Sequence, residues 1–182
     1  MPVILLVGMP GAGKEEFVRV ALKKGYAVIR MGDVVREYVQ SMGLPLENKI
    51  VGKIAGEERD KHGVGIWARR TVEKIRRQKA QNVVIDGIRC MEEVDIYRKE
   101  FGENVHLVGI FAPRRVRFER ILKRARPDDV RTWEEFVARE ERELSWGLGK
   151  VFALSDHMLL NIRTLEEYWA EVESFLADLE KT

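Results

Sequence analysis

The chain has 182 residues, 45% of them apolar, and this length and composition predict one domain with a sizeable core. Its 32 basic and 30 acidic side chains leave a net charge of +2, so neither a nucleic-acid nor a membrane partner is expected. The single cysteine, Cys90, excludes an internal disulfide and is typical of a reducing compartment, which predicts a cytoplasmic protein.

Apolar runs of strand length alternate with amphipathic stretches of helix length, and this alternation predicts a parallel sheet covered by helices. The first run, residues 3–7, is wholly apolar, as a strand buried on both faces should be, and it is too short to span a membrane. In chain order the predicted elements are strand 3–7, helix 13–24, strand 27–31, a helical region at 33–78, strand 83–86, helix 91–100, strand 105–111, helix 113–126, helix 133–144, strand 157–161 and a last helix from 164. We therefore expect a doubly wound α/β domain with five parallel strands, helices on both faces and ligands beyond the carboxyl ends of the strands.

Turn and cap signals mark the ends of several predicted elements. Breaks at 43–45 and 63–65 divide the long helical region. Gly147 is predicted to stop the helix that precedes it, and Thr164 with Glu167 forms a capping box for the last helix.

Residues 8–14, Gly-Met-Pro-Gly-Ala-Gly-Lys, fit the phosphate-loop pattern G-x-x-x-x-G-K between a predicted strand and a predicted helix. In that setting backbone N–H groups and the helix dipole face the phosphates, and glycines let the backbone approach them closely. An ordinary strand-to-helix turn is the alternative, but the flanking elements favour a phosphate loop with Lys14 at the β- and γ-phosphates of ATP. The predicted nucleotide-binding residues of this segment are Gly8, Met9, Pro10, Gly11, Ala12, Gly13, Lys14 and Glu15.

Glu15 departs from the pattern, which calls for Ser or Thr to place a hydroxyl on Mg²⁺. A carboxylate of Glu15 or Glu16 can bind Mg²⁺ in place of that hydroxyl, directly or through water. Alternatively both face outward as first-turn acids that complement the helix dipole, which is the interpretation we favour for Glu16. An unpaired carboxylate beside a triphosphate would repel it, so Glu15 is expected to meet metal or solvent.

The loop resembles that of the adenylate-kinase branch of phosphate-loop proteins, G-x-P-G-x-G-K, in which the residue after the lysine is also neither Ser nor Thr. Residues 32–36, Gly-Asp-Val-Val-Arg, resemble the G-D-x-x-R element of that branch, whose arginine grips the phosphate of the acceptor. Residues 86–89, Asp-Gly-Ile-Arg, resemble its D-G-x-P-R element with the proline missing. The resemblance implies that Arg36 and Arg89 bind a phosphate on the acceptor.

The resemblance continues toward the C-terminus. Arg120 and Arg124 resemble the R-x-x-x-R pair that reaches the donor nucleotide, and residues 126–129 with Arg139 resemble the far side of a lid. Residues 155–167 resemble the end of dephospho-CoA kinases. Because the helix that carries the R-x-x-x-R pair is basic throughout, a solvated surface is the alternative for its arginines.

Over nearly its whole length the chain resembles a group of archaeal proteins described as adenylate-kinase-like or dephospho-CoA-kinase-like. The resemblance implies ATP as a ligand and the sheet order 2-3-1-4-5. It also implies an acceptor-binding helical segment at about 33–78 and a short lid at about 120–142. Lys14 and Arg124 would then act on the transferring phosphoryl group.

Two aspartates are candidates for further roles in the chemistry. Asp86 ends an apolar strand beside the strand that leads into the phosphate loop, where a carboxylate would hold the water shell of Mg²⁺; a helix cap or turn is its alternative. Asp33 is the candidate general base if the acceptor is a hydroxyl, and an N-cap of the following helix otherwise.

The sequence supports a small-molecule kinase that uses Mg·ATP and transfers the γ-phosphoryl group to a nucleotide or a related phosphate-bearing acceptor. Transfer to a hydroxyl, as in dephospho-CoA kinases, is the alternative within the same class. A slow ATPase that acts on a macromolecule and a sensor that binds nucleotide without catalysis are the alternatives of other classes. The paired candidates Arg36 and Arg89 favour the kinase with a phosphate-bearing acceptor.

Overall fold

The computed structural model describes residues 2–125 and 129–181, and within them five strands form one parallel sheet in the order β2-β3-β1-β4-β5. The strands are β1 (Val3–Val7), β2 (Ala27–Arg30), β3 (Val83–Asp86), β4 (Val105–Phe111) and β5 (His157–Leu160). The predicted fold and strand order are confirmed.

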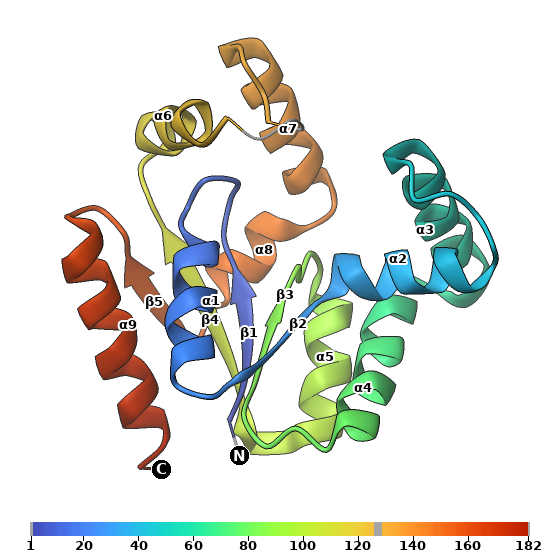
Figure 1. Cartoon of the computed structure of the whole chain (residues 1–182), viewed down its shortest axis with the longest axis horizontal. Coiled ribbons are helices and arrows are strands. Elements are labelled where there is room, and N and C mark those ends of the chain that lie inside the picture. The colour runs from blue at the N-terminus through green and yellow to red at the C-terminus, as the bar shows by residue number, and fades with distance from the viewer. Residues whose placement is uncertain (1, 126–128, 182) are drawn as a thin grey trace.

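Helices cover both faces of this sheet (Figure 1). The helices are α1 (Lys14–Lys23), α2 (Met31–Ser41), α3 (Asn48–His62), α4 (Ile66–Gln78), α5 (Met91–Phe101), the 3₁₀ turn η1 (Gly102–Asn104), α6 (Arg114–Arg124), α7 (Trp133–Ser145), α8 (Leu148–Ala153) and α9 (Leu165–Leu179). Among the residues described, no helix combines the length and the apolarity needed to cross a membrane.

Strand β1 contributes to both hydrophobic cores, which explains why its residues are all apolar. Val3, Leu5 and Val7 join the core formed with α2, α4, α5 and α8. Ile4 and Leu6 join the core formed with α1 and α9 on the opposite face. Since successive side chains of a strand point to opposite faces, a central strand covered on both sides must be apolar throughout.

Two groups of helices project beyond the sheet and frame the carboxyl ends of its strands. In Figure 1, α6 and α7 lie above the strand ends, and α2 and α3 extend to the right. The turn that follows β1 lies between these two groups. The fold therefore places the predicted phosphate loop at the edge of the sheet where ligands of doubly wound proteins bind.

The element boundaries agree with the sequence except at a few points. The predicted capping box is present, because the Thr164 hydroxyl accepts from the Glu167 N–H and the Glu167 carboxylate accepts from the Thr164 N–H. Gly147 follows α7 with φ near +103°, as its predicted role requires, but a further helix, α8, begins at Leu148. Of residues 126–129, which resemble the far side of a lid, residues 126–128 lie outside the described residues.

Candidate functional site

The turn between β1 and α1 has the glycine-dependent backbone of a phosphate loop. Gly11 and Gly13 have φ of +81° and +110°, a region that residues with a Cβ rarely adopt. A Cβ on Gly8 would lie 2.8 Å from the Ile110 carbonyl oxygen, and one on Gly11 would lie 2.6 Å from the Arg117 carbonyl oxygen. The loop is therefore shaped both by its own dihedral angles and by close packing against β4 and α6.

A pocket of about 560 Å³ opens beside this loop. Lys14 lies in it, and its ammonium donates to the Gly8 carbonyl at 2.9 Å, across the mouth of the loop. The residues that line the pocket are Pro10, Gly11, Ala12, Gly13, Lys14, Glu15, Glu16, Arg19, Asp86, Arg120, Ile121, Arg124, Arg139, Asn161 and Leu165. Most of the predicted nucleotide-binding residues are thus brought together, whereas Met9 packs against the core.

Asn161 supports the loop from the far end of the chain, a role that the sequence did not reveal. Its side chain is buried and donates from Nδ2 to the Ala12 carbonyl at 2.9 Å. Arg120 in turn donates to both the backbone oxygen and the Oδ1 atom of Asn161, each at 3.1 Å. The only sequence signal was the position of Asn161 as the last residue of a predicted strand, at the edge of the sheet where ligands bind.

Gly13→Ala is expected to abolish ATP binding, because the new Cβ would lie 2.1 Å from Asn161 Nδ2 and would break the contact of Asn161 with the loop. Gly25→Ala is the matched control, since Gly25 also has positive φ, +84°, but no atom within 4 Å of the added Cβ. Calorimetric titration with ATP checks both variants. Equal affinity of Gly13→Ala and wild type would contradict the role of this loop.

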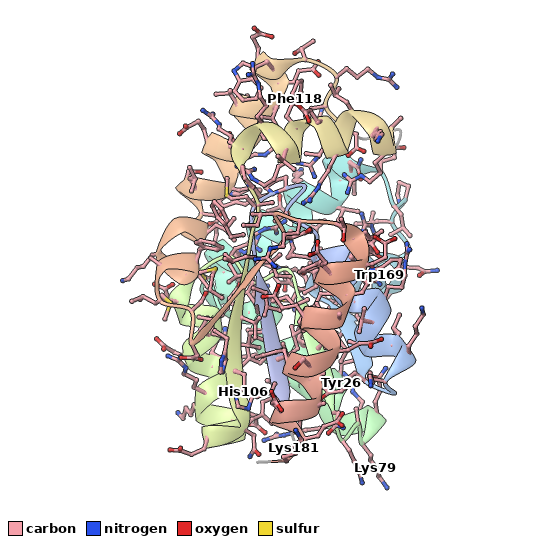
Figure 2. All side chains as sticks on the ribbon, turned by 90° about the vertical axis from the view of Figure 1, so that its left-hand side faces the viewer. Tyr26, Lys79, His106, Phe118, Trp169 and Lys181 are labelled. Atoms are coloured by element: carbon pink, nitrogen blue, oxygen red, sulfur yellow. The ribbon has the colours of Figure 1, made fainter. Side chains whose placement is uncertain are left out.

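Glu15 and Glu16 have different partners. Glu15 Oε1 accepts from Arg30 Nη2 at 2.8 Å while the residue lines the pocket, so its charge is partly neutralised on the side of β2. Glu16 accepts from the Trp169 indole N–H at 3.0 Å and pairs with Arg19, but it also lines the pocket. The outward orientation favoured above stays a prediction. Figure 2 shows Trp169 on the side of α9 that faces α1. A metal role for Glu15 stays a prediction.

Asp86 has the surroundings expected of a carboxylate near Mg²⁺. It is the last residue of β3, it lines the pocket with Lys14, and its Oδ1 is buried without a hydrogen-bond partner in the described structure. Within the same residues no cluster of three or more His, Cys, Asp or Glu can hold a metal by protein ligands alone. This donor set fits Mg²⁺, which keeps several waters and takes further ligands from phosphates.

The arginines of α6 and α7 lie on the side of the pocket opposite α1. Arg124 donates to Asp129 through Nε, at 2.9 Å, and through Nη2, and Arg139 pairs with the same carboxylate at 3.7 Å. Asp129 is nearly buried. Together with Arg120, these side chains give the pocket a positive wall that faces the loop.

The predicted acceptor residues lie outside this pocket. Asp33 is the third residue of α2, whose N-cap is Arg30, so the interpretation of Asp33 as the N-cap is wrong. Asp33 Oδ1 instead pairs with Arg36 Nη1 at 3.4 Å. Arg89 pairs with Glu143 at 3.6 Å, and its guanidinium stacks 4.5 Å from the ring centre of Trp146.

Two half-buried ionisable residues near Arg89, Arg59 and Cys90, have no role in the sequence-based predictions. Burial lowers the pKa of Arg59, the negative charge of Glu93 raises it, and the positive charge of Arg89 lowers it. The guanidinium groups of Arg59 and Arg89 are therefore close enough to repel each other. Burial raises the pKa of the Cys90 thiol to about 12, and Glu93 adds to the shift. Cys90 is therefore protonated near neutral pH, in agreement with a structural role.

Comparisons with known proteins identify the family and the fold of the chain. The AAA domain model matches residues 7–137. A UPF0200 protein of Thermoplasma volcanium is 48% identical over 96% of both chains. Among solved structures, TT1252 from Thermus thermophilus has a TM-score of 0.69 at 18% identity, over 98% of this chain and 97% of that one. Dephospho-CoA kinase from Campylobacter jejuni has a TM-score of 0.58 at 13% identity, over 99% and 98%.

These structural similarities show the fold, which is that of small P-loop kinases. The match at residues 7–137 includes the whole phosphate loop, which implies nucleotide binding. By its sequence the chain belongs to the UPF0200 family, and its nucleotide-binding core is a P-loop AAA domain.

Proposed function

We propose that this protein is an ATP-dependent kinase that transfers the γ-phosphoryl group to a small phosphate-bearing acceptor, such as a nucleotide. One observation carries the proposal: a single pocket at the carboxyl ends of the strands contains the phosphate loop with Lys14, the unpartnered carboxylate of Asp86, and the arginines of α6 and α7. Phosphoryl transfer requires mainly positioning and neutralisation of charge, which these groups can supply.

Each group has a defined task in this reaction. An acceptor oxygen attacks the γ-phosphorus, the bond from that phosphorus to the β–γ bridging oxygen breaks, and ADP leaves. Lys14 and the loop N–H groups hold the β- and γ-phosphates, while Arg120 and Arg124 offset the negative charge from the opposite wall. Mg²⁺ bound with ATP supplies further charge neutralisation, and Asp86, with Glu15, would hold its water shell.

The acceptor would bind beside Arg36 and Arg89, on the side of the site formed by α2, α3 and α7. Both side chains are half exposed, and their carboxylate partners lie at 3.4 Å and 3.6 Å. Such exposed ion pairs contribute about 0–1 kcal/mol, less than the charge-assisted hydrogen bonds that a phosphate offers two guanidinium groups. A phosphate on the acceptor can therefore displace Asp33 and Glu143 from these arginines.

The test is a screen for ADP release with ATP, Mg²⁺ and one acceptor at a time. The acceptors are nucleoside monophosphates, dephospho-CoA, shikimate and gluconate, beside a sample with none. A nucleoside monophosphate is expected to raise the rate well above that of the sample without acceptor. Arg89→Met is expected to raise the KM for that acceptor at least about tenfold, because one charged hydrogen bond is lost. The control Arg115→Met, on the exposed face of α6, should leave this KM unchanged.

Other outcomes of the screen contradict the proposal in distinct ways. Turnover with shikimate, gluconate or dephospho-CoA alone would indicate a hydroxyl acceptor, with Asp33 as the candidate base. Slow ADP release that ignores every acceptor would indicate an ATPase.

In wild type, Mg²⁺ is expected to raise the affinity for ATP. Asp86→Asn should reduce this gain in affinity about 10- to 100-fold, because the Asp86 carboxylate would orient the waters of the metal. Calorimetric titration with ATP at increasing MgCl₂ measures this change without requiring turnover. ATP affinity in the absence of Mg²⁺ should stay at the wild-type value or rise. Asp95→Asn, at an exposed position of α5, is the control. If Mg²⁺ raised the ATP affinity of Asp86→Asn as much as that of wild type, Asp86 would have no role at the metal and would serve only the turn after β3.

A further inference from the structure

A buried ion cluster joins α6 to α7 directly behind the phosphate loop. Arg117 of α6 is 6% exposed and Glu140 of α7 is 3% exposed. Arg117 Nη2 donates to Glu140 Oε1 at 2.6 Å, and Arg114 Nε donates to Glu140 Oε2 at 2.6 Å. Both oxygens of this carboxylate are thus held by arginines of α6.

The same guanidinium group also reaches the phosphate loop. Arg117 Nη1 donates to the Pro10 carbonyl at 3.2 Å, and its Nε donates to the Ala112 carbonyl at 3.1 Å. The backbone carbonyl of Arg117 abuts Gly11, where an added Cβ would lie 2.6 Å from it. Arg117 therefore contacts the loop through both its side chain and its backbone, and it contacts α7 through the remaining nitrogen.

Aromatic side chains surround this ion cluster. The ring of Phe118 lies 5.2 Å from that of Trp133 and 5.3 Å from that of Phe136, measured between centroids. The Arg117 guanidinium lies 5.4 Å from the centre of Phe136. Figure 2 shows Phe118 at the end of the molecule beyond the sheet. A charged pair in such surroundings can shift only by breaking desolvated contacts, so α7 is held in one position relative to α6.

Glu140 directly follows Arg139, which lines the nucleotide pocket. Any displacement of Glu140 along or away from α6 would carry Arg139 with it, because neighbouring residues of one helix move together. The chain of contacts thus runs from the Pro10 carbonyl through Arg117 and Glu140 to Arg139. Arg117, which supports the loop, therefore also determines the position of Arg139 on the opposite wall of the pocket.

We propose that Arg117 is a positioning residue for the γ-phosphate: through Glu140 it holds Arg139 at the distance from the phosphate loop at which its guanidinium meets a bound triphosphate. This inference rests on the proposed function only in requiring that the pocket binds ATP. Arg117 itself does not touch the nucleotide. Without this contact the loop still binds a diphosphate, and the preference for a triphosphate is lost.

The test is the ratio of affinities for Mg·AMP-PNP, a triphosphate analogue that is not hydrolysed, and Mg·ADP, both measured by calorimetry. Arg139→Ala is expected to lower this ratio about tenfold, the effect of one charged contact. Arg117→Lys keeps the charge but replaces three separated nitrogens with a single ammonium, which cannot reach Ala112, Pro10 and Glu140 together. It is expected to lower the ratio by a similar factor. The double variant should show no further loss, since both changes remove the same contact. Arg115→Lys, exposed on α6, should keep the wild-type ratio.

Glu140→Gln extends the test to the other end of the pair and decides the matter if Arg117→Lys does not fold. This substitution keeps the shape of the side chain and removes its charge, at a residue whose hydrogen bonds are to Arg114 and Arg117 rather than to the loop. It is expected to lower the ratio as Arg139→Ala does. A wild-type ratio in Glu140→Gln, an equal loss of both ligands in Arg117→Lys, or effects that multiply in the double variant would each overturn the proposal.

The acceptor screen is independent of this outcome. Suppose that no acceptor activates the wild-type protein but the variants still lower the ratio of affinities. The proposed kinase activity would then be refuted, while the proposed role of Arg117 would stand. A wild-type protein that binds neither nucleotide would refute the pocket, and the inference with it.

Discussion

Lys14→Ala is expected to lower ADP release by about 10²–10³-fold and to weaken Mg·ATP binding at least about tenfold. The Lys14 ammonium lies at the mouth of the loop, where it donates to the Gly8 carbonyl at 2.9 Å, and bound phosphates would take the place of that carbonyl. A preorganised cation at developing negative charge stabilises the transition state more than the ground state, so the loss in rate should exceed the loss in affinity. Single-turnover ADP release and calorimetric titration measure the two quantities.

Lys24→Ala is the matched control, because Lys24 is exposed at the opposite end of the same helix. It is expected to leave both the rate and the affinity at their wild-type values. If Lys14→Ala bound Mg·ATP as tightly as the wild type, residues 8–14 would be an ordinary turn, and the proposed function would fail with them.

Trp67→Ala is expected to lower the free energy of unfolding by about 3–5 kcal/mol. Trp67 of α4 is wholly buried and touches two other helices: its indole N–H donates to the Ala55 carbonyl of α3 at 3.2 Å, and the Tyr38 ring of α2 lies 5.7 Å away between centroids. The Arg70 guanidinium stacks 4.7 Å from its ring centre. Urea-induced unfolding followed by circular dichroism measures the change.

Two further variants identify the source of this stability. Trp67→Phe keeps most of the packing and loses the indole donor, so it is expected to cost about 1–3 kcal/mol. Trp146→Ala removes a half-exposed ring that stacks on Arg89, and it is expected to cost about 1 kcal/mol or less. A cost of Trp67→Ala close to that of Trp146→Ala would show that α3 does not depend on this residue for its position.

Local patterns were enough to predict the parallel strands and the glycine-rich turn, whereas the strand order came from the family resemblance. The apolar run of β1 and the glycine-rich segment after it are continuous in sequence, and each has a favoured physical explanation: burial on both faces, and backbone approach to phosphate. Asp86 could be placed as well, since the end of an apolar strand fixes where its last residue emerges. For these residues the position in the element decides the surroundings of the side chain.

Partners distant in sequence were beyond the reach of such patterns. Arg117 is one of many basic residues on a helix that a sequence alone describes as solvated, and its burial depends on Glu140, 23 residues away, and on Pro10, 107 residues away. Asn161 was equally inconspicuous. Asp33 was misplaced as a cap because α2 begins at Met31, directly after β2, with no connecting turn to signal its start.

The contact between Asn161 and the phosphate loop has a consequence for the order of events during synthesis, if the loop binds ATP as proposed. The loop emerges from the ribosome early, but the side chain that holds the Ala12 carbonyl follows 149 residues later. Strand β1 also lacks its neighbours until β3 and β4 have been made, so the loop has no scaffold before then. A nascent chain that ends before β5 should therefore not retain ATP, and nucleotide binding becomes a property of the nearly finished polypeptide.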